Sequence, residues 1–186
     1  LLLDLGAGAN RMGGSILAQV FSEFGDTAPD VDDAQALKGF FDSMQSSIEQ
    51  GEIVAYHDRS DGGLLTTLAE MSFAGHVGVS VDLTDLDANS MAVLFNEELG
   101  GVIQVRADSA DVLAQRFADS GVSVHRLGTL NSNDSLEISR DGEMLFACDR
   151  TALQACWSET SYQVASLRDN AECVEQEFER IGKADI

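Results

Sequence analysis

The sequence predicts an α/β (α+β) fold in which a mixed sheet is covered on both faces by helices. Short apolar runs typical of strands alternate with longer stretches of helical periodicity, without a regular β-α-β period. The 186 residues lie in the usual size range of one domain, and 44% of them are hydrophobic, which is enough for a sizeable core.

The first half of the chain predicts two units in which a strand, a glycine-containing loop and a helix follow one another. Pro29 and several acidic residues after it introduce a further helix between these units, and this helix is expected to end near Gly51. The predicted elements are a strand at 1–5, a loop at 6–15, a helix at 16–24, a helix at 31–48, a strand at 53–56 and a helix at 64–73.

The second half predicts more strands than helices. Asp141-Gly142 is a strong turn signal and predicts a hairpin. From Asp149 the pattern becomes helical, and past Asp169 it becomes acidic and poor in large apolar residues. The predicted elements are strands at 77–83, 101–105 and 122–127, a short helix at 112–117, hairpin strands at 136–138 and 144–146, and a helix at 149–167.

The charge of the chain is strongly negative, which excludes several classes of function. There are 32 acidic and 11 basic residues, for a net charge of -21. This charge repels nucleic acid and anionic membrane surfaces, and no apolar run approaches the roughly 20 residues that span a bilayer. An anionic nucleotide therefore needs local compensation from Mg²⁺, helix N-termini or a basic neighbouring domain.

The three cysteines lack the paired spacing of zinc or redox sites. We expect Cys148, Cys156 and Cys173 to be reduced thiols of a cytoplasmic protein, with Cys148 and Cys156 buried on one helical stretch. Trp157 is expected in the core. The apolar start, without an initiator Met or a basic leader, predicts that the chain is a fragment entered at a core strand.

The most informative motif is His57-Asp58-Arg59-Ser60-Asp61-Gly62-Gly63, which lies between a predicted strand and a predicted helix. Glycines at such a turn let the backbone approach a ligand, and the helix N-terminus carries partial positive charge. Asp58 and Ser60 supply oxygen ligands of the kind that Mg²⁺ prefers. The alternative is that Asp58, Ser60 or Asp61 only caps the helix.

Two other segments hold candidate functional residues. Gly13, Gly14 and Ser15 precede a predicted helix and could face a phosphate, although a plain tight turn fits equally well. The glycine spacing of the loop does not fit a dinucleotide-binding fingerprint. Residues 96–98 are Asn-Glu-Glu, for which an interface or structural role is favoured over catalysis.

Three segments together resemble a known family: residues 56–64, the helical stretch 68–76, and Phe95-Asn96-Glu97-Glu98-Leu99-Gly100. They resemble the large, multidomain phosphoribosylformylglycinamidine synthases (formylglycinamide ribonucleotide amidotransferases) of purine biosynthesis. The similarity extends over about residues 1–170. Within such an enzyme, the sequence most specifically resembles the C-terminal subdomain of the second aminoimidazole-ribonucleotide-synthetase-like module.

This resemblance implies a three-layer α/β/α fold with partial ferredoxin-like topology. It implies a domain at 1–169 and a partly helical linker at 170–186 toward a glutaminase domain. The implied partners are that domain, an N-terminal-type synthetase subdomain and a nucleotide.

The implied reaction converts formylglycinamide ribonucleotide, glutamine and ATP to the amidine, glutamate, ADP and phosphate, and a fragment is not expected to catalyse it alone. By resemblance, Asp58 binds Mg²⁺ and Ser60 contacts ATP or ADP in an auxiliary site, while no catalytic residue is expected in this chain. The alternative is a purely structural interdomain docking module.

Overall fold

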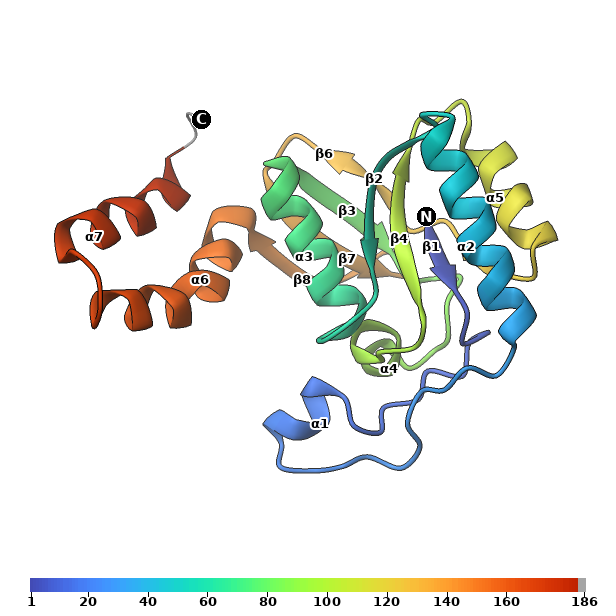
Figure 1. The fold of residues 1–186 in the computed structure, drawn as a ribbon, viewed down its shortest axis with the longest axis horizontal. Helices are drawn as coiled ribbons and strands as arrows, with labels where there is room; N and C mark the ends of the chain where they lie inside the picture. The colour runs from blue at the N-terminus through green and yellow to red at the C-terminus, as the bar shows by residue number, and fades with distance from the viewer. Residues whose placement is uncertain (184–186) are drawn as a thin grey trace.

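The computed structural model describes residues 1–183 and divides their strands between two four-stranded sheets (Figure 1). In the first sheet the strand order is β2-β4-β1-β5, and every neighbouring pair is antiparallel. Its strands are β1 (Leu2–Asp4), β2 (Ile53–Asp58), β4 (Gly100–Val105) and β5 (Ser123–His125).

The second sheet is the mixed one. Its order is β6-β3-β7-β8, in which β3 and β7 are parallel and the other neighbours antiparallel. The predicted hairpin across Asp141-Gly142 is confirmed as β7 and β8. The strands are β3 (Gly78–Asp82), β6 (Gly128–Asn131), β7 (Ser135–Arg140) and β8 (Glu143–Asp149).

Helices cover both faces of the first sheet, so the predicted α/β class and its layers are confirmed. Helices α2 (Ala34–Glu49) and α5 (Ala110–Asp119) pack on one face, in a core that contains Leu3 of β1. Leu2 faces the opposite way, as expected for adjacent residues of a strand, into a second core. This second core contains α3 (Gly63–Gly75), α4 (Ser90–Phe95) and apolar residues of the second sheet.

The division into two sheets was not expected from the sequence. Both sheets contribute apolar side chains to the same core, including Val102 of β4 and Ile138 of β7. The alternation of apolar residues along a strand reports which face is buried, but it does not report which strands are neighbours. One continuous sheet and two sheets around a shared core therefore have the same sequence pattern.

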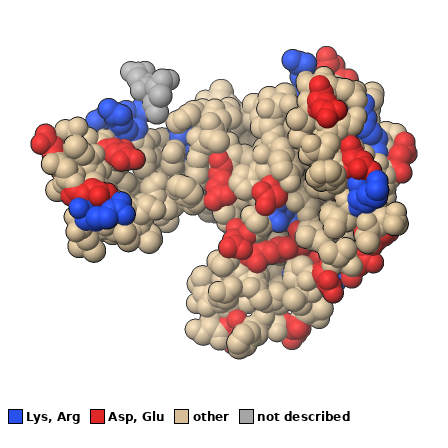
Figure 2. Space-filling model, viewed as in Figure 1, with Lys and Arg blue, Asp and Glu red and all other residues tan. Residues whose placement is uncertain are grey.

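The predicted apolar helix at 16–24 is shorter and more exposed than its spacing indicated. Helix α1 covers only Ile16–Val20, and the side chains of Phe21 and Phe24 are 70% and 89% exposed. The chain reverses at Ser22, whose φ of 58° is left-handed, and Gly14 N–H bonds to the Phe24 carbonyl at 2.7 Å. Figure 2 shows this segment at the bottom of the view as a mostly uncharged lobe.

The C-terminal region forms an arm of α6 (Arg150–Ser166), α7 (Ala171–Glu179) and a 3₁₀ turn (Arg180–Gly182), which extends away from the sheets (Figure 1). The predicted linker at 170–186 is therefore helical over much of its length, and its residues 184–186 lie outside the described part. Tyr162 stacks on Phe178 with ring centroids 4.3 Å apart, which joins the two helices.

Two expectations for this region are wrong. Cys148 lies in β8 and Cys156 lies exposed in α6, so the two cysteines do not share a helix. Trp157 is 60% exposed rather than buried in the core. Helix α6 leaves the body of the domain, so its apolar residues face few partners. Within residues 1–183, none of the helices has the length and apolar character needed to cross a bilayer.

Glu137 gives the second sheet a pH-dependent contribution to stability. Hydrogen bonds from Asn133, Ser80 and Ser135 hold the pKa of the Glu137 carboxyl below its usual 4.5. A lowered pKa stabilises the fold above the unfolded-state pKa, and this stabilisation disappears as the pH falls through the folded-state pKa. Glu137→Gln should therefore be less stable than wild type at neutral pH, with a difference that shrinks below about pH 4.5.

The measurement is urea unfolding of both proteins between about pH 3 and pH 7. Glu143→Gln in the neighbouring strand is the control, because Glu143 is exposed and should show no such convergence. A constant difference between wild type and Glu137→Gln over this range would contradict the assignment.

Candidate functional site

The turn from β2 to α3 exposes the side chains that the sequence singled out. Asp58 is the last residue of β2, and its carboxylate is 65% exposed. Ser60 and Asp61 are exposed as well. The N-cap of α3 is Gly62, with φ 84°, and the side chains of Asp58, Ser60 and Asp61 accept no hydrogen bond from the first turn of the helix. The alternative in which Asp58, Ser60 or Asp61 caps α3 is therefore wrong.

Arg59 points in the opposite direction from these side chains and anchors the turn. It is only 5% exposed, and its guanidinium forms an ion pair with the buried carboxylate of Asp4. Arg59 Nε donates to the Glu98 carbonyl at 2.7 Å, and Nη2 donates to the Leu99 carbonyl at 3.1 Å. Its backbone N–H also donates to the Gly100 carbonyl at 2.9 Å. The turn is thus tied to the end of β1 and the start of β4.

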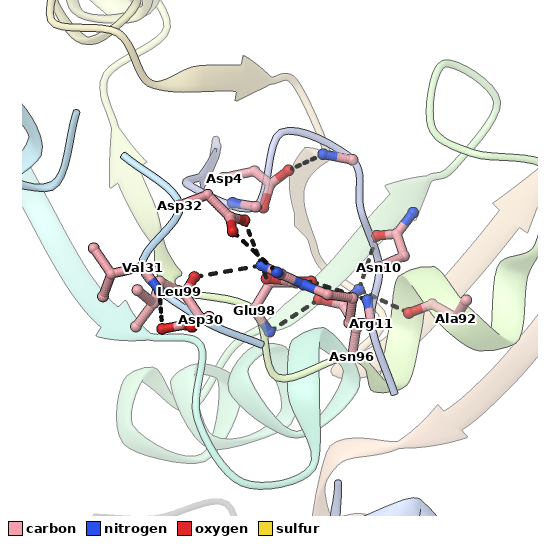
Figure 3. A network of polar contacts seen from close by, with 12 residues as sticks. Asp4, Asn10, Arg11, Asp30, Val31, Asp32, Ala92, Asn96, Glu98 and Leu99 are labelled. Carbon is pink, nitrogen blue, oxygen red and sulfur yellow. Dashed lines mark hydrogen bonds and ion pairs between the residues drawn. The ribbon is translucent and has the colours of Figure 1, made fainter. Parts of the chain in front are cut away.

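A second buried carboxylate organises the loop after β1 (Figure 3). Glu98 is 1% exposed, and its Oε1 accepts hydrogen bonds from the backbone N–H and Nε of Arg11, at 2.9 and 2.7 Å. Arg11 also pairs with Asp32, at 2.7 Å, which closes the base of the loop that carries α1. These hydrogen bonds, first to Glu98 and then to Asp32, raise the pKa of Arg11. Arg11 therefore stays charged at any physiological pH.

Glu97 connects the glycine loop with the Asp58 turn. Its Oε1 accepts from the backbone N–H of Gly62 and from that of Ile16, both at 2.8 Å. A single carboxylate oxygen therefore lies at the N-terminal ends of both α3 and α1, where partial positive charge favours an anion. This bridge brings residues 13–15 next to the turn.

The polar groups of the glycine loop have partners within the chain. Gly13 N–H donates to Thr27 and Gly14 N–H to Phe24, both at 2.7 Å. The buried Ser15 accepts a hydrogen bond from Ala18 N–H at 3.2 Å as the N-cap of α1. A phosphate contact by Gly13, Gly14 and Ser15 stays a prediction, and it would require some of these bonds to be exchanged.

A cavity of about 340 Å³ lies away from this turn, in the core between the two sheets. Its lining is largely apolar, with Leu68, Val81 and Val105 among its residues, and it includes neither Asp58 nor Ser60. The candidate site is therefore an exposed corner at one edge of the first sheet rather than an enclosed pocket.

Residues 3–141 match the family model described as AIR synthase related protein, C-terminal domain. The chain belongs to this family. The match covers both sheets as far as Asp141, and it ends before β8 and the helical arm.

Solved structures of larger proteins contain the fold of this AIR synthase related domain. Thermotoga maritima PurL complexed with ATP matches with a TM-score of 0.61 and 16% identity, over 67% of this chain and 22% of PurL. The same protein complexed with FGAR matches with a TM-score of 0.58 and 15% identity, over 66% and 21%. PurLQS from T. maritima matches with a TM-score of 0.60 and 14% identity, over 75% and 24%. The chain thus spans about a quarter of these proteins or less.

A Mg²⁺ site in the AIR synthase related domain stays a prediction. Within residues 1–183, no three His, Cys, Asp or Glu side chains lie together so that they could hold an ion. Mg²⁺, however, is commonly bound by one or two carboxylates together with phosphate oxygens and water. The exposed carboxylate of Asp58 and the exposed side chain of Ser60, two residues apart in the sequence, are donors of the kind that one half of such a site needs.

The supporting residues of this domain were mostly missed by sequence reasoning. Arg59 belongs to the motif that predicts a ligand site, but it is a buried anchor, and the sequence predicts Asp4 only as part of the strand at 1–5. A charged residue directly after the apolar run Leu1-Leu2-Leu3 was the available signal for Asp4. The structural role favoured for residues 96–98 agrees with the buried Asn96 and Glu98.

Proposed function

We propose that this domain forms one wall of an auxiliary Mg²⁺–nucleotide site in a purine-biosynthesis ligase of the phosphoribosylformylglycinamidine synthase type. Asp58 would hold the cation and Ser60 would contact ATP or ADP. The observation that carries the proposal is that neighbouring side chains of the β2–α3 turn differ in burial and in bonding. Arg59 is engaged within the protein through its guanidinium and its backbone N–H, whereas the Asp58 and Ser60 side chains are exposed.

The charge of the domain supports a cation in this role. With a net charge of -21, the chain repels free nucleotide phosphates, and a bound Mg²⁺ would neutralise part of the phosphate charge. Asp58 would orient the ion from the end of β2, and Ser60 would act as a hydrogen-bond partner from the turn. No residue of this chain is assigned a bond-making step.

We infer that the domain works inside a longer polypeptide or complex. An N-terminal-type synthetase subdomain would complete the nucleotide site, and a glutaminase domain would supply ammonia for conversion of formylglycinamide ribonucleotide to the amidine. The fold shared with T. maritima PurL, which has been solved in complex with ATP and with FGAR, supports this assignment. The isolated chain is expected to be inactive.

The test is Asp58→Ala in the full-length protein that carries this domain. Nucleotide retained after purification should fall at least tenfold, roughly the loss typical when a supporting ligand of a metal is removed. The melting temperature should fall too, because a tightly bound ligand stabilises the native state. Nucleotide is quantified by chromatography of the denatured protein, and melting is followed by calorimetry.

Asp108→Ala is the matched control, since it removes the same charge from an exposed residue near the opposite end of β4. It should leave nucleotide content unchanged. Full retention of nucleotide in Asp58→Ala would reject the proposed site.

A second candidate is a docking module with no ligand. The exposed side chains of Phe21 and Phe24 on the α1 lobe favour it, because a strongly acidic surface with an apolar projection suits burial against another domain. The same experiment separates the two functions, since docking alone predicts no nucleotide loss in Asp58→Ala.

A further inference from the structure

Three side chains from three elements, Trp157, Glu70 and His57, form a row of polar contacts that ends at the Asp58 turn. The indole Nε1–H of Trp157 in α6 donates to Glu70 Oε1 in α3 at 2.9 Å. Glu70 Oε2 lies 2.9 Å from Nε2 of His57 in β2. The other ring nitrogen of His57, Nδ1, lies 2.7 Å from the backbone carbonyl oxygen of Asp58.

The end of this row of contacts is the carbonyl that precedes Arg59. The hydroxyl of Thr67 shares its one hydrogen between this oxygen, at 3.2 Å, and the Gly63 carbonyl oxygen, at 3.0 Å, so that His57 and Thr67 both contact the Asp58 peptide. On the other side, Arg59 holds the turn to β1 and β4 through buried contacts. The direction of the Asp58 carboxylate depends on this peptide, because side-chain orientation follows the backbone.

Trp157, the first residue in this row of contacts, lies outside the part of the protein that matches the family model. The match ends at residue 141, and Trp157 belongs to the arm that follows. Trp157 is largely exposed, and its ring centroid lies 6.0 Å from that of the buried Phe73. Its position is thus defined by two contacts with α3, the Phe73 ring and the Glu70 carboxylate.

We propose that Glu70 is a positioning residue for the Mg²⁺–nucleotide site at the β2–α3 turn. Through Trp157, the C-terminal arm also helps to position the Asp58 carboxylate of this site. Glu70 orients the His57 ring, the ring holds the Asp58 carbonyl, and the carboxylate of Asp58 is thereby aimed at the cation. This inference rests on the proposed function. It adds that residues with no ligand contact, including one in the arm, set the affinity for Mg²⁺–nucleotide.

The variants Glu70→Ala and Glu70→Gln separate positioning from a general effect on the fold. Alanine removes both acceptors. Glutamine can keep all three contacts. Its oxygen accepts from Trp157, and its NH₂ donates to His57 Nε2, while Nδ1–H of the ring donates to the Asp58 carbonyl. Affinity for Mg²⁺–ADP in the full-length protein should fall about tenfold in Glu70→Ala and return to within about twofold of wild type in Glu70→Gln.

Trp157→Phe tests the contribution of the arm. It keeps an aromatic ring against Phe73 and removes the indole N–H. Because the Glu70 side chain is 28% exposed, water can replace the lost donor in part, and we expect about a threefold loss of affinity. Glu159→Gln is the control on the same helix, since Glu159 is exposed and accepts a hydrogen bond from Gln163 on the same helix.

A spectroscopic readout on the 186-residue chain needs no ligand. The Hδ1 proton of His57 should be protected from exchange in wild type and Glu70→Gln, and it should be lost to exchange in Glu70→Ala. Two-dimensional ¹H–¹⁵N spectra of the imidazole rings measure this directly. The melting temperatures of the same samples show whether any affinity change merely follows stability.

Each outcome decides a separate point. If Asp58→Ala loses nucleotide but Glu70→Ala binds as wild type does, the positioning role is wrong and the proposed function stands. If Glu70→Gln and Glu70→Ala bind Mg²⁺–ADP equally weakly, the polar contacts of Glu70 do not determine the affinity, and the inference also fails. If Trp157→Phe bound Mg²⁺–ADP with wild-type affinity, the C-terminal arm would have no part in positioning Asp58. Retention of nucleotide by Asp58→Ala would reject the proposed function itself.

Discussion

Replacing Arg59 by Ala is expected to destabilise the domain by about 3–5 kcal/mol, as is typical when one partner of a buried ion pair is removed. Asp4 would keep its hydrogen bonds from Gly6 and Gly8 N–H, at 3.1 and 2.8 Å, but its buried charge would lose its counter-ion. The Glu98 carbonyl would lose the Arg59 donor as well, and the Leu99 carbonyl would keep only its hydrogen bond from Leu5 N–H. Urea unfolding at neutral pH measures the difference.

The control is Arg168→Ala, which removes an arginine from an exposed pair with Asp169. Solvent screens that pair, so no measurable loss of stability is expected. The double variant Arg59→Met with Asp4→Asn should recover part of the loss, because it removes both buried charges together. Equal stabilities of wild type and Arg59→Ala would mean that the pair does not anchor the turn.

Gly63→Ala is the second change with a large expected effect, a loss of about 2–4 kcal/mol from backbone strain and steric overlap together. Gly63 has a left-handed φ of 67°, and a Cβ there would lie 2.6 Å from the Asn96 carbonyl oxygen and 2.8 Å from that of Leu94. These atoms are backbone at the end of α4, so a side-chain rotation cannot relieve the overlap. Thermal and urea unfolding both report the change.

Gly51→Ala separates the two causes. Gly51 has nearly the same φ, 68°, but open space where a Cβ would lie. Its substitution should cost about 1 kcal/mol, which is the backbone contribution alone. If Gly63→Ala were no worse than Gly51→Ala, α3 and α4 would not be in the close contact that the structure describes.

The sequence predicted local elements well, because local patterns determine them. The β7–β8 hairpin followed from Asp141-Gly142, and the strand-to-helix turn followed from residues 57–63. The ion pairs that hold the β2–α3 turn and the neighbouring loop in place could not be predicted from local patterns. Arg59 and Asp4 are 55 residues apart, and Arg11 and Glu98 are 87 residues apart. A single sequence gives no signal for which of many charged residues meet.

The failed predictions share a physical cause. The helical stripe at 16–24 and the position of Trp157 were inferred from periodicity, which assumes a neighbouring surface that buries the apolar face. In this chain the α1 lobe and α6 both project from the body, and that surface is missing for much of their length. Periodicity reported the amphipathic character of these segments correctly, but it could not report what lies beside them.

The pairing of both arginines at this corner has a consequence for discrimination between ligands. Arg59 is matched by Asp4, and Arg11 is matched by Glu98 and Asp32, so neither guanidinium is available to an incoming anion. A nucleotide that arrives without a counter-ion would meet the exposed carboxylates of Asp58 and Asp61, which neither of these arginines pairs with. The corner should therefore select the metal chelate over the bare polyphosphate, and chelating agents should empty it even when free nucleotide is abundant.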